Sequence, residues 1–346
     1  MRLSLCWIAL TQNTDMRTYL IVLLAICFVA CSSSETAADP TNTSDPVDNN
    51  GDNSGGGDTD GGEDVVDFPT DAATGNLELT LQHDGGTREY ILYVPNNYDS
   101  TQEYPLVLAL HGLGSNNTQH RAYTGWRSIA DNNNLIIAYP QGLPNSSGQN
   151  HWNVLGWDTT STSDDVGFID TLITEIGLTY NLELDRVYST GMSNGGFMSF
   201  RLACELPNRI AAIGSVTGTM TPQVLASCNP SQATTVVQIQ GTADPLVSYN
   251  GTPVTTSVAA VTTFWTDFNN TDVTPDETAL PNVSTTDGSD IDEFVYDNGD
   301  NDTQYVHLRV NGGGHSWPGA WDNQDIIAAE YIWDVIGQYD INGRIN

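Results

Sequence analysis

The sequence predicts an α/β fold built on a mostly parallel, doubly wound sheet, and three observations carry this prediction. Strand-like and helix-like segments alternate from residue 105 onward, which is typical of a parallel sheet with helices on both faces. Residues 105–110 form a continuous apolar run, as expected of a strand buried on both faces. A strand at 186–190 leads through a glycine-rich turn into a helix that begins near Gly196. Sheets of this kind bind ligands beyond the carboxyl ends of their strands.

Each element of this fold has a local signal. The folded part begins with an antiparallel pair, because residues 77–81 alternate in polarity and residues 88–94 follow after the turn Asp84-Gly85-Gly86. Short β-branched or apolar runs predict further strands at 105–110, 135–139, 186–190, 210–216 and 235–239, and a hairpin around 294–296 and 305–310. Helical spacing of apolar residues predicts helices at 126–132, 165–180, 196–202, 258–268 and 326–339. We expect one folded domain, without internal repeats.

An export signal is expected in residues 1–30. Arg17 precedes an apolar run at 18–30 that ends in a small residue before Cys31, and the run is shorter than the ~20 residues of a membrane-spanning helix. The pattern is similar to bacterial lipoprotein signals, which implies that Cys31 is lipidated and that Met16 is an alternative start. The serine after Cys31 then implies the outer membrane. Secretion with cleavage near Ala30 and no lipid is the alternative.

Residues 31–73 are expected to form a disordered acidic tether. They are mostly Asp, Gly, Ser, Thr and Asn, so they cannot bury enough apolar surface to offset the entropy cost of ordering. The run at 58–62 is faintly similar to a calcium loop, but no glutamate follows at the required spacing, so we interpret it as a spacer. Residues 74–346 are left for the folded domain.

The charge of the chain narrows its possible partners, and its cysteine content predicts a disulfide. The formal net charge is −33 and the chain has no lysine, which argues against nucleic acid or an anionic membrane surface as a partner. We expect contact with a membrane only through the N-terminal lipid, and we expect a monomer. Outside the signal and Cys31, the remaining cysteines are Cys204 and Cys228, and an even pair in an exported protein predicts a disulfide. Two buried thiols are the alternative.

A candidate nucleophile lies in the turn Gly191-Met192-Ser193-Asn194-Gly195. Between a strand and a helix, a Gly-x-Ser-x-Gly turn forms the nucleophile elbow of α/β-hydrolases. The elbow holds its serine in a strained backbone above the sheet, and glycines flank it because a Cβ would strike the neighbouring elements. The pattern alone is weak, and an ordinary turn is the alternative. Its place between a strand and a helix favours the elbow.

Two further groups complete a Ser-His-Asp arrangement. Asp244 follows the strand at 235–239 and His315 follows the strand at 305–310. The order Ser, Asp, His along the chain is that of α/β-hydrolases. A serine hydroxyl needs a base, and that base needs a group that orients it. We choose His315 because the other histidines lie in early loops, in a strand or in another motif (His83, His111, His120, His151 and His307). A loop cap at Asp244 and a flexible connector at His315 are the alternatives.

Stabilisation of a developing oxyanion is expected from backbone N–H groups. The segment His111-Gly112-Leu113-Gly114 directly follows the buried strand at 105–110. Its N–H groups, together with that of Asn194 after the candidate nucleophile, would form an oxyanion hole. Glycine suits this segment because the backbone must approach the substrate closely.

The chain resembles the secreted esterases of the polyhydroxybutyrate depolymerase and feruloyl esterase family, which includes acetyl xylan esterases. The resemblance covers residues 76–340 and rests on Leu110-His111-Gly112, Asp164-Asp165-Val166-Gly167-Phe168-Ile169, Gly191-Met192-Ser193-Asn194-Gly195-Gly196, Gly241-Thr242-Ala243-Asp244-Pro245 and Gly313-Gly314-His315-Ser316-Trp317-Pro318-Gly319. It implies that Ser193 is the nucleophile, Asp244 the orienting group and His315 the base, with the oxyanion hole at Leu113 and Asn194. The family often has Cys or Gly in place of Leu113, a change of little weight because this residue acts through its backbone.

The expected substrate contacts are Trp317, Trp157 and His111. Trp317 follows the candidate base closely, where walling an ester pocket and packing in the core are equally good interpretations. Trp152 and Trp157 lie in a loop rich in Asn and Gly and are candidates for the same rim.

No metal or cofactor is expected. Asp164 and Asp165 look like a carboxylate pair, but they more simply begin the helix that follows, where negative charge suits the helix dipole.

The sequence therefore predicts an extracytoplasmic serine carboxylic-ester hydrolase that works through an acyl-enzyme. No stretch is long enough for a large helical lid, so we expect an open site. An open site favours feruloyl or acetyl esters of polysaccharide, with hydroxybutyrate polyester close behind. A serine peptidase on the same fold and a non-catalytic glycan-binding surface lipoprotein are the alternatives.

Overall fold

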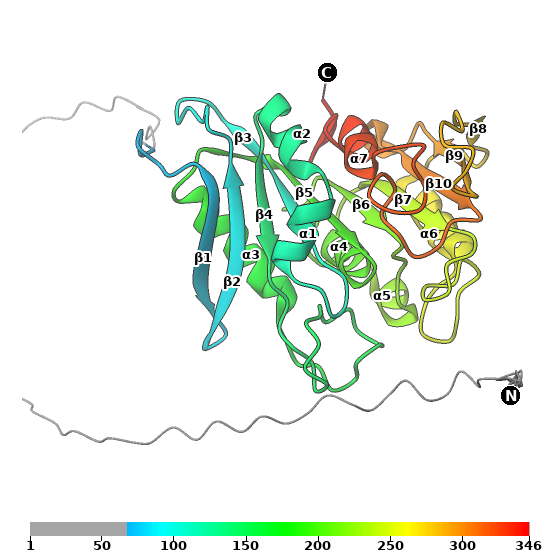
Figure 1. Cartoon of the computed structure of the whole chain (residues 1–346), viewed down its shortest axis with the longest axis horizontal. Helices are drawn as coiled ribbons and strands as arrows, with labels where there is room; N and C mark the ends of the chain where they lie inside the picture. Colours follow the sequence, from blue (N-terminus) through cyan, green and yellow to red (C-terminus); the bar gives the residue numbers. More distant parts are fainter. Residues whose placement is uncertain (1–67, 346) are drawn as a thin grey trace, which may run out of the picture. The chain divides into compact units, whose positions relative to one another are not determined.

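The computed structural model describes residues 68–345, shown in Figure 1. The predicted signal at 1–30, the lipidation site Cys31 and most of the predicted tether lie outside the described residues. None of the described helices is long and apolar enough to cross a membrane.

One sheet runs through the centre of the described part (Figure 1). Its strands are β1 (Gly75–His83), β2 (Gly86–Val94), β3 (Tyr104–Leu110), β4 (Ile136–Pro140), β5 (Leu182–Met192), β6 (Ala212–Val216), β7 (Thr235–Gly241), β8 (Asp276–Ala279), β9 (Asp290–Tyr296) and β10 (Tyr305–Asn311). It is ten-stranded, in the order β1-β2-β4-β3-β5-β6-β7-β10-β9-β8. All neighbours from β4 to β10 in this order are parallel, and antiparallel pairs lie toward the two edges. The predicted mostly parallel sheet is confirmed.

Helices cover both faces of this sheet. They are α1 (Asn117–Tyr123), α2 (Trp126–Asn133), α3 (Asp165–Gly177), α4 (Asn194–Glu205), α5 (Pro222–Ser227), α6 (Val258–Asn269) and α7 (Ala328–Ile336), with a 3₁₀ turn at Asp300–Asp302. Side chains alternate along β3, so that Leu106 and Leu108 join the core that contains α3, α4 and α6. Val107 and Ala109 join the opposite core, which contains α2 and α7. This is the doubly wound arrangement of the α/β-hydrolase fold.

Several short elements have no signal in apolar periodicity. α1 begins where the side chain of Asn116 accepts a hydrogen bond from the N–H of Gln119. α5 begins where the side chain of Thr221 accepts a hydrogen bond from the N–H of Val224, and a proline follows Thr221. Their signals are caps rather than apolar stripes, so periodicity missed them. Other unpredicted elements are the edge strand β8 and a terminal hairpin of β11 (Tyr339–Asp340) and β12 (Gly343–Arg344). The helices predicted at 165–180 and 326–339 correspond to α3 and α7, which are shorter than predicted.

A disulfide joins Cys204 and Cys228, whose Cα atoms lie 5.0 Å apart. It connects the end of α4 to the residue that ends α5. The predicted disulfide is therefore present, and the alternative of two thiols is wrong.

Candidate active site

Ser193 lies in a strained turn between β5 and α4. It is the N-cap of α4, with φ 54° and ψ −121°, a backbone conformation that residues other than glycine rarely adopt. Its N–H donates to the carbonyl of Val216, at a distance of 2.8 Å. A Cβ on Gly195 would lie 2.1 Å from the carbonyl oxygen of Leu110, so only glycine fits where β3 meets the turn. The turn has the form that the nucleophile elbow requires.

Asp244 and His315 are joined by a short hydrogen bond. The distance between Nδ1 of His315 and Oδ2 of Asp244 is 2.8 Å, and the carboxylate is fully buried. The backbone N–H groups of Leu246 and Val247 donate to the other oxygen of Asp244, at 2.8 and 2.9 Å. Because this carboxylate is held from several sides, it fixes the imidazole with Nε2 as its remaining ring nitrogen.

Gln240 is a partner of Asp244 that sequence reasoning missed. Its side-chain amide donates to Oδ2 of Asp244 at 3.0 Å and to the carbonyl of Val247 at 2.9 Å. Gln240 lies near the end of β7 within a strand-like run, and nothing in that pattern distinguishes it from a core position.

A close backbone approach brings the loops of Asp244 and His315 together. A Cβ on Gly241 would lie 2.3 Å from the carbonyl oxygen of Gly313, so the loop after β10 packs directly on the end of β7. The N–H of Ala243 donates to that same carbonyl at 3.0 Å. The two sequence motifs therefore form one unit, although 71 residues separate the paired side chains.

Ser193 and His315 line one cavity with a volume of about 1230 Å³. No hydrogen bond joins their side chains in the described part of the chain. Such bonds are often long before substrate binds and tighten in the reacting complex. The geometry can therefore support a serine nucleophile, a histidine base and an orienting carboxylate.

Both expected oxyanion donors border this cavity. Leu113 and Asn194 line it, and a Cβ on Gly112 would lie 3.5 Å from the Cβ of Ser193. Within residues 68–345, neither Leu113 nor Asn194 donates its backbone N–H to a protein acceptor. The N–H of Asn194 also lies in the first turn of α4, where the helix dipole favours negative charge.

Three fully or nearly fully buried histidines are poor candidates for the base. Burial lowers the pKa of His111 and of His307 to about 4, and it lowers the pKa of His120 well below the usual value. Across the described residues, no group of three or more His, Cys, Asp or Glu side chains is placed to hold a metal ion.

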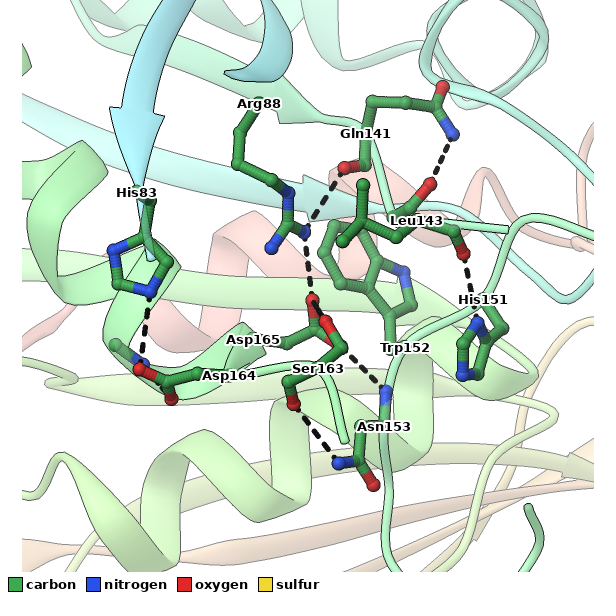
Figure 2. Close-up of polar contacts among 12 residues, drawn as sticks. His83, Arg88, Gln141, Leu143, His151, Trp152, Asn153, Ser163, Asp164 and Asp165 are labelled. Carbon is green, nitrogen blue, oxygen red and sulfur yellow. Dashed lines mark hydrogen bonds and ion pairs between the residues drawn. The ribbon is translucent and has the colours of Figure 1, made fainter. Parts of the chain in front are cut away.

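One wall of the cavity is made of buried residues. This buried wall, residues 151–154, belongs to the long segment between β4 and α3. Oδ2 of Asp165 accepts the N–H of Asn153 at 2.7 Å, and its Oδ1 pairs with Arg88 at 2.8 Å. Figure 2 shows Arg88 and Asp165 pointing toward each other, with the backbone of Asn153 beside the carboxylate. A buried ion pair thus anchors the segment that carries the wall.

Asp164 and Asp165 have different structural roles. Asp164 caps α3 by accepting the N–H of Gly167 at 3.0 Å, so the prediction that the pair begins the helix is confirmed. Asp165 is fully buried and accepts hydrogen bonds from three residues, a role that the sequence pattern did not reveal. A buried aspartate at a helix start can be recognised only when its distant partner, Arg88, is known.

The mouth of the cavity carries exposed apolar side chains. This apolar rim consists of Leu113, Leu246, Val254 and Trp321. Trp157, a predicted substrate contact, also lines the cavity, where it packs against Phe197 with ring centroids 4.3 Å apart. Its indole N–H donates to the carbonyl of Val254 at 3.2 Å. The rim residues come from three separate segments, after β3, between β7 and α6, and after β10, so no sequence motif marks them as a group.

Two predicted substrate contacts are wrong. Trp317 is 1% exposed and packs edge-on against His120 and Tyr123, so it belongs to the core. His111 is also fully buried, and its ring bonds the backbone of Gly112 and Gly142. Neither Trp317 nor His111 lines the cavity, so neither is placed to contact substrate. Tyr123, which does line the cavity, lies beside Trp317 and was missed.

Known proteins share these features. A family model described as "Esterase PHB depolymerase" matches residues 88–259. The chain is 30% identical over 268 residues to the "Putative esterase NocK" of Nocardia uniformis subsp. tsuyamanensis, an alignment that covers 72% of this chain and 75% of that protein. The chain belongs to this esterase family. The resemblance stated from the sequence motifs is confirmed, and the described domain is by class a carboxylic ester hydrolase.

Two further proteins extend this comparison. The chain is 24% identical over 262 residues to the bifunctional acetylxylan esterase/xylanase of Neocallimastix patriciarum, covering 76% of this chain but only 35% of that longer protein. The solved acetyl xylan esterase from Aspergillus awamori has a TM-score of 0.56 and 18% identity, covering 76% of this chain and 98% of its own. The second similarity supports the α/β-hydrolase fold.

Proposed function

We propose that this protein hydrolyses carboxylic esters through an acyl-enzyme formed on Ser193. The observation that carries the proposal is the short, buried hydrogen bond from His315 to Asp244, at the edge of the cavity that also contains Ser193. A histidine oriented in this way, beside a serine in a strained elbow, is the arrangement that activates a serine hydroxyl.

The reaction follows from the placement of these groups. Oγ of Ser193 attacks the ester carbonyl while Nε2 of His315 accepts its proton, and the backbone N–H groups of Leu113 and Asn194 stabilise the resulting oxyanion. When the tetrahedral intermediate collapses, the C–O bond to the alcohol breaks and His315 returns the proton to the departing alcohol. Water then attacks the acyl-enzyme by the same route, which releases the carboxylic acid and restores Ser193.

The cavity supports a substrate with an aromatic or short acyl group on a larger alcohol. Its volume exceeds the roughly 300–1,000 Å³ of ordinary small-molecule sites, and Trp157 and Tyr123 offer aromatic surfaces within it. Feruloyl or acetyl esters of polysaccharide fit this description, and hydroxybutyrate esters are the second class. The names of two similar proteins, an acetylxylan esterase/xylanase and an acetyl xylan esterase, agree with the first class.

We also propose that the protein works outside the cytoplasm. The apolar run before Cys31 and the disulfide between Cys204 and Cys228 support export, and Cys31 is the proposed lipid attachment site. Fractionation of producing cells tests this: the mature chain should be found with membranes, and an unprocessed chain in the cytoplasm would contradict it.

Replacement of the nucleophile tests the central proposal. Ser193→Ala should lower kcat for p-nitrophenyl acetate by a factor on the order of 10⁶, because the acyl-enzyme cannot form. Ser128→Ala, on the exposed side of α2, is the matched control and should keep full activity. A fluorophosphonate should label the wild-type protein and spare the Ser193 variant. Full activity or labelling of that variant would show that another group is the nucleophile.

A panel of esters tests the substrate class. We expect methyl ferulate or acetylated xylan to be hydrolysed with higher kcat/KM than hydroxybutyrate trimer and p-nitrophenyl palmitate. Preference for the trimer would reverse the two proposed classes. Preference for the palmitate would contradict both.

A further inference from the structure

The side chain of Asn194 is fully engaged by the backbone of one distant residue. Its Oδ1 accepts the N–H of Trp152 at 2.6 Å, and its Nδ2 donates to the carbonyl of Trp152 at 3.1 Å. Asn194 is 1% exposed, so its amide does not face the solvent in the cavity. This side chain ties the start of α4 to the buried wall, and its backbone N–H remains free for substrate.

Trp152 continues this connection to the segment after β3. Its indole N–H donates to the carbonyl of His111 at 2.9 Å, and the His111 and Trp152 rings pack with centroids 5.1 Å apart. The ring of His111 in turn donates from Nδ1 to the carbonyl of Gly112 and accepts the N–H of Gly142 at Nε2, at 2.8 and 3.0 Å. Hydrogen bonds to the carbonyls of His111 and Gly112 therefore hold the two peptide groups that precede Leu113.

The two proposed oxyanion donors belong to different segments. Leu113 follows β3, and Asn194 begins α4. The pairing of β3 with β5, which ends at Leu110 beside Gly191, joins these segments through the sheet. Beyond the ends of the strands, a second hydrogen-bonded route runs from the Asn194 amide through Trp152 to His111. Donors aimed at an oxyanion act through their fixed mutual geometry, and a small displacement weakens them.

We propose that the Asn194 side chain is a positioning group for the oxyanion hole, which it fixes by acting through Trp152 on the 111–113 peptides. This inference rests on the proposed esterase function. It assigns to one residue two separable roles: the backbone N–H binds the oxyanion, and the side-chain amide sets where the second donor lies. Asn194→Ala removes only the second role.

The chain offers a matched control for the loss of such an amide. Asn269, at the end of α6, is also fully buried and makes the same pair of bonds to the backbone of Thr234: its Oδ1 accepts the N–H at 3.0 Å, and its Nδ2 donates to the carbonyl at 2.7 Å. Thr234 precedes β7, whereas Asp244 follows that strand, so this second amide lies toward the opposite end of the sheet. Asn269→Ala should reproduce the structural cost without touching the site.

The test measures two properties of both variants: the hydrolysis of p-nitrophenyl acetate and the affinity for a phenylboronic acid. Such an acid forms a tetrahedral adduct on an active serine. Asn194→Ala should lower kcat by about 10- to 100-fold, less than the ~10²- to 10³-fold loss expected for deleting an oxyanion donor. KM should stay within about threefold, and boronate affinity should fall in proportion to kcat. Asn269→Ala should lower the melting temperature similarly and leave kcat unchanged.

A second variant keeps the proposal testable if Asn194→Ala does not fold. Trp152→Phe keeps an aromatic side chain and the backbone groups that Asn194 binds, but it loses the indole N–H that bonds His111, and it should lower kcat about tenfold in the same pattern. Wild-type kcat in Trp152→Phe, or equal loss in both asparagine variants, would overturn the proposal. A wild-type protein without esterase turnover would instead contradict the proposed function, so the two failures are distinguishable.

Discussion

The buried wall and the apolar rim border the same cavity but are built in opposite ways. Trp152 and Val154 of the wall are 1% and 2% exposed, and backbone bonds to Asp165, Asn194 and Thr221 hold the wall in place. Leu246 and Trp321 of the rim are 71% and 47% exposed. Polar anchoring is directional and fixes atoms, whereas apolar contact is not directional and tolerates different shapes.

This difference indicates a division of tasks. The wall lies against Asn194 and His111, next to the proposed oxyanion hole, whose geometry has to be constant. The rim lies at the mouth, where groups of varied shape on a polymeric ester would rest. Changes in the wall should therefore affect stability and kcat, and changes in the rim should affect KM.

The largest effect should come from the buried ion pair behind the wall. Asp165→Asn leaves the guanidinium of Arg88 buried without a countercharge, and we expect a loss of about 3–5 kcal/mol in the free energy of unfolding. Urea unfolding measures this loss. Asp170→Asn is the matched control, because Asp170 lies on the same helix and pairs with Arg209 at a more exposed site; it should cost less than about 1 kcal/mol.

A double variant sharpens this first test. Adding Arg88→Met to Asp165→Asn removes the unpaired charge and should recover part of the lost stability. If Asp165→Asn is no more destabilised than Asp170→Asn, the ion pair does not anchor the wall.

His111, which packs against the wall, should also make stability depend on pH. Burial holds the pKa of His111 at about 4, below the value near 6.5 of an exposed histidine. Between these values the unfolded chain binds a proton that the folded chain does not, so the free energy of unfolding should fall as pH falls, by on the order of 2 kcal/mol between pH 6.5 and 5.

Replacement of His111 separates its share of this slope from that of other groups. His307, whose pKa is also lowered to about 4 by burial, contributes in the same direction. Urea titrations at pH 7 and pH 5 measure this difference in the free energy of unfolding. In His111→Gln the difference should be smaller than in the wild type but still present. An unchanged slope would mean that His111 does not stay neutral in the folded protein.

The smallest effects should come from the mouth of the cavity. Trp157→Ala removes an aromatic surface that lines the cavity, and we expect KM for methyl ferulate to rise by about tenfold with kcat within a few-fold. Leu246→Ser changes a mostly exposed side chain, and the free energy of unfolding should shift by less than about 0.5 kcal/mol. A large fall in kcat for Trp157→Ala would place this residue with the wall.

Local signals in the sequence predicted the buried strands and the amphipathic helices well, and the elements specified by a cap or by edge pairing poorly. The apolar run that became β3 and the periodic stretch that became α3 are long enough to carry a pattern. α5 and β8 carry no apolar pattern of this kind: α5 is specified by its cap at Thr221, and the exposed strand β8 by pairing with β9. The motifs around Ser193, Asp244 and His315 were recognisable because each combines reactive residues with glycines at a strand end.

The sequence by itself determined the fold class, the strand-end positions of the candidate triad and the cysteine pair, because each depends on signals that are local in the chain. Only the tertiary structure decided which side chains meet across it. Trp317 lies two positions after His315 yet turns into the core, while Leu246 and Trp321 reach the cavity mouth. Asp165 became an anchor because folding placed Arg88, 77 residues away, beside it. Such encounters are set by the packing of distant segments, which no local pattern encodes.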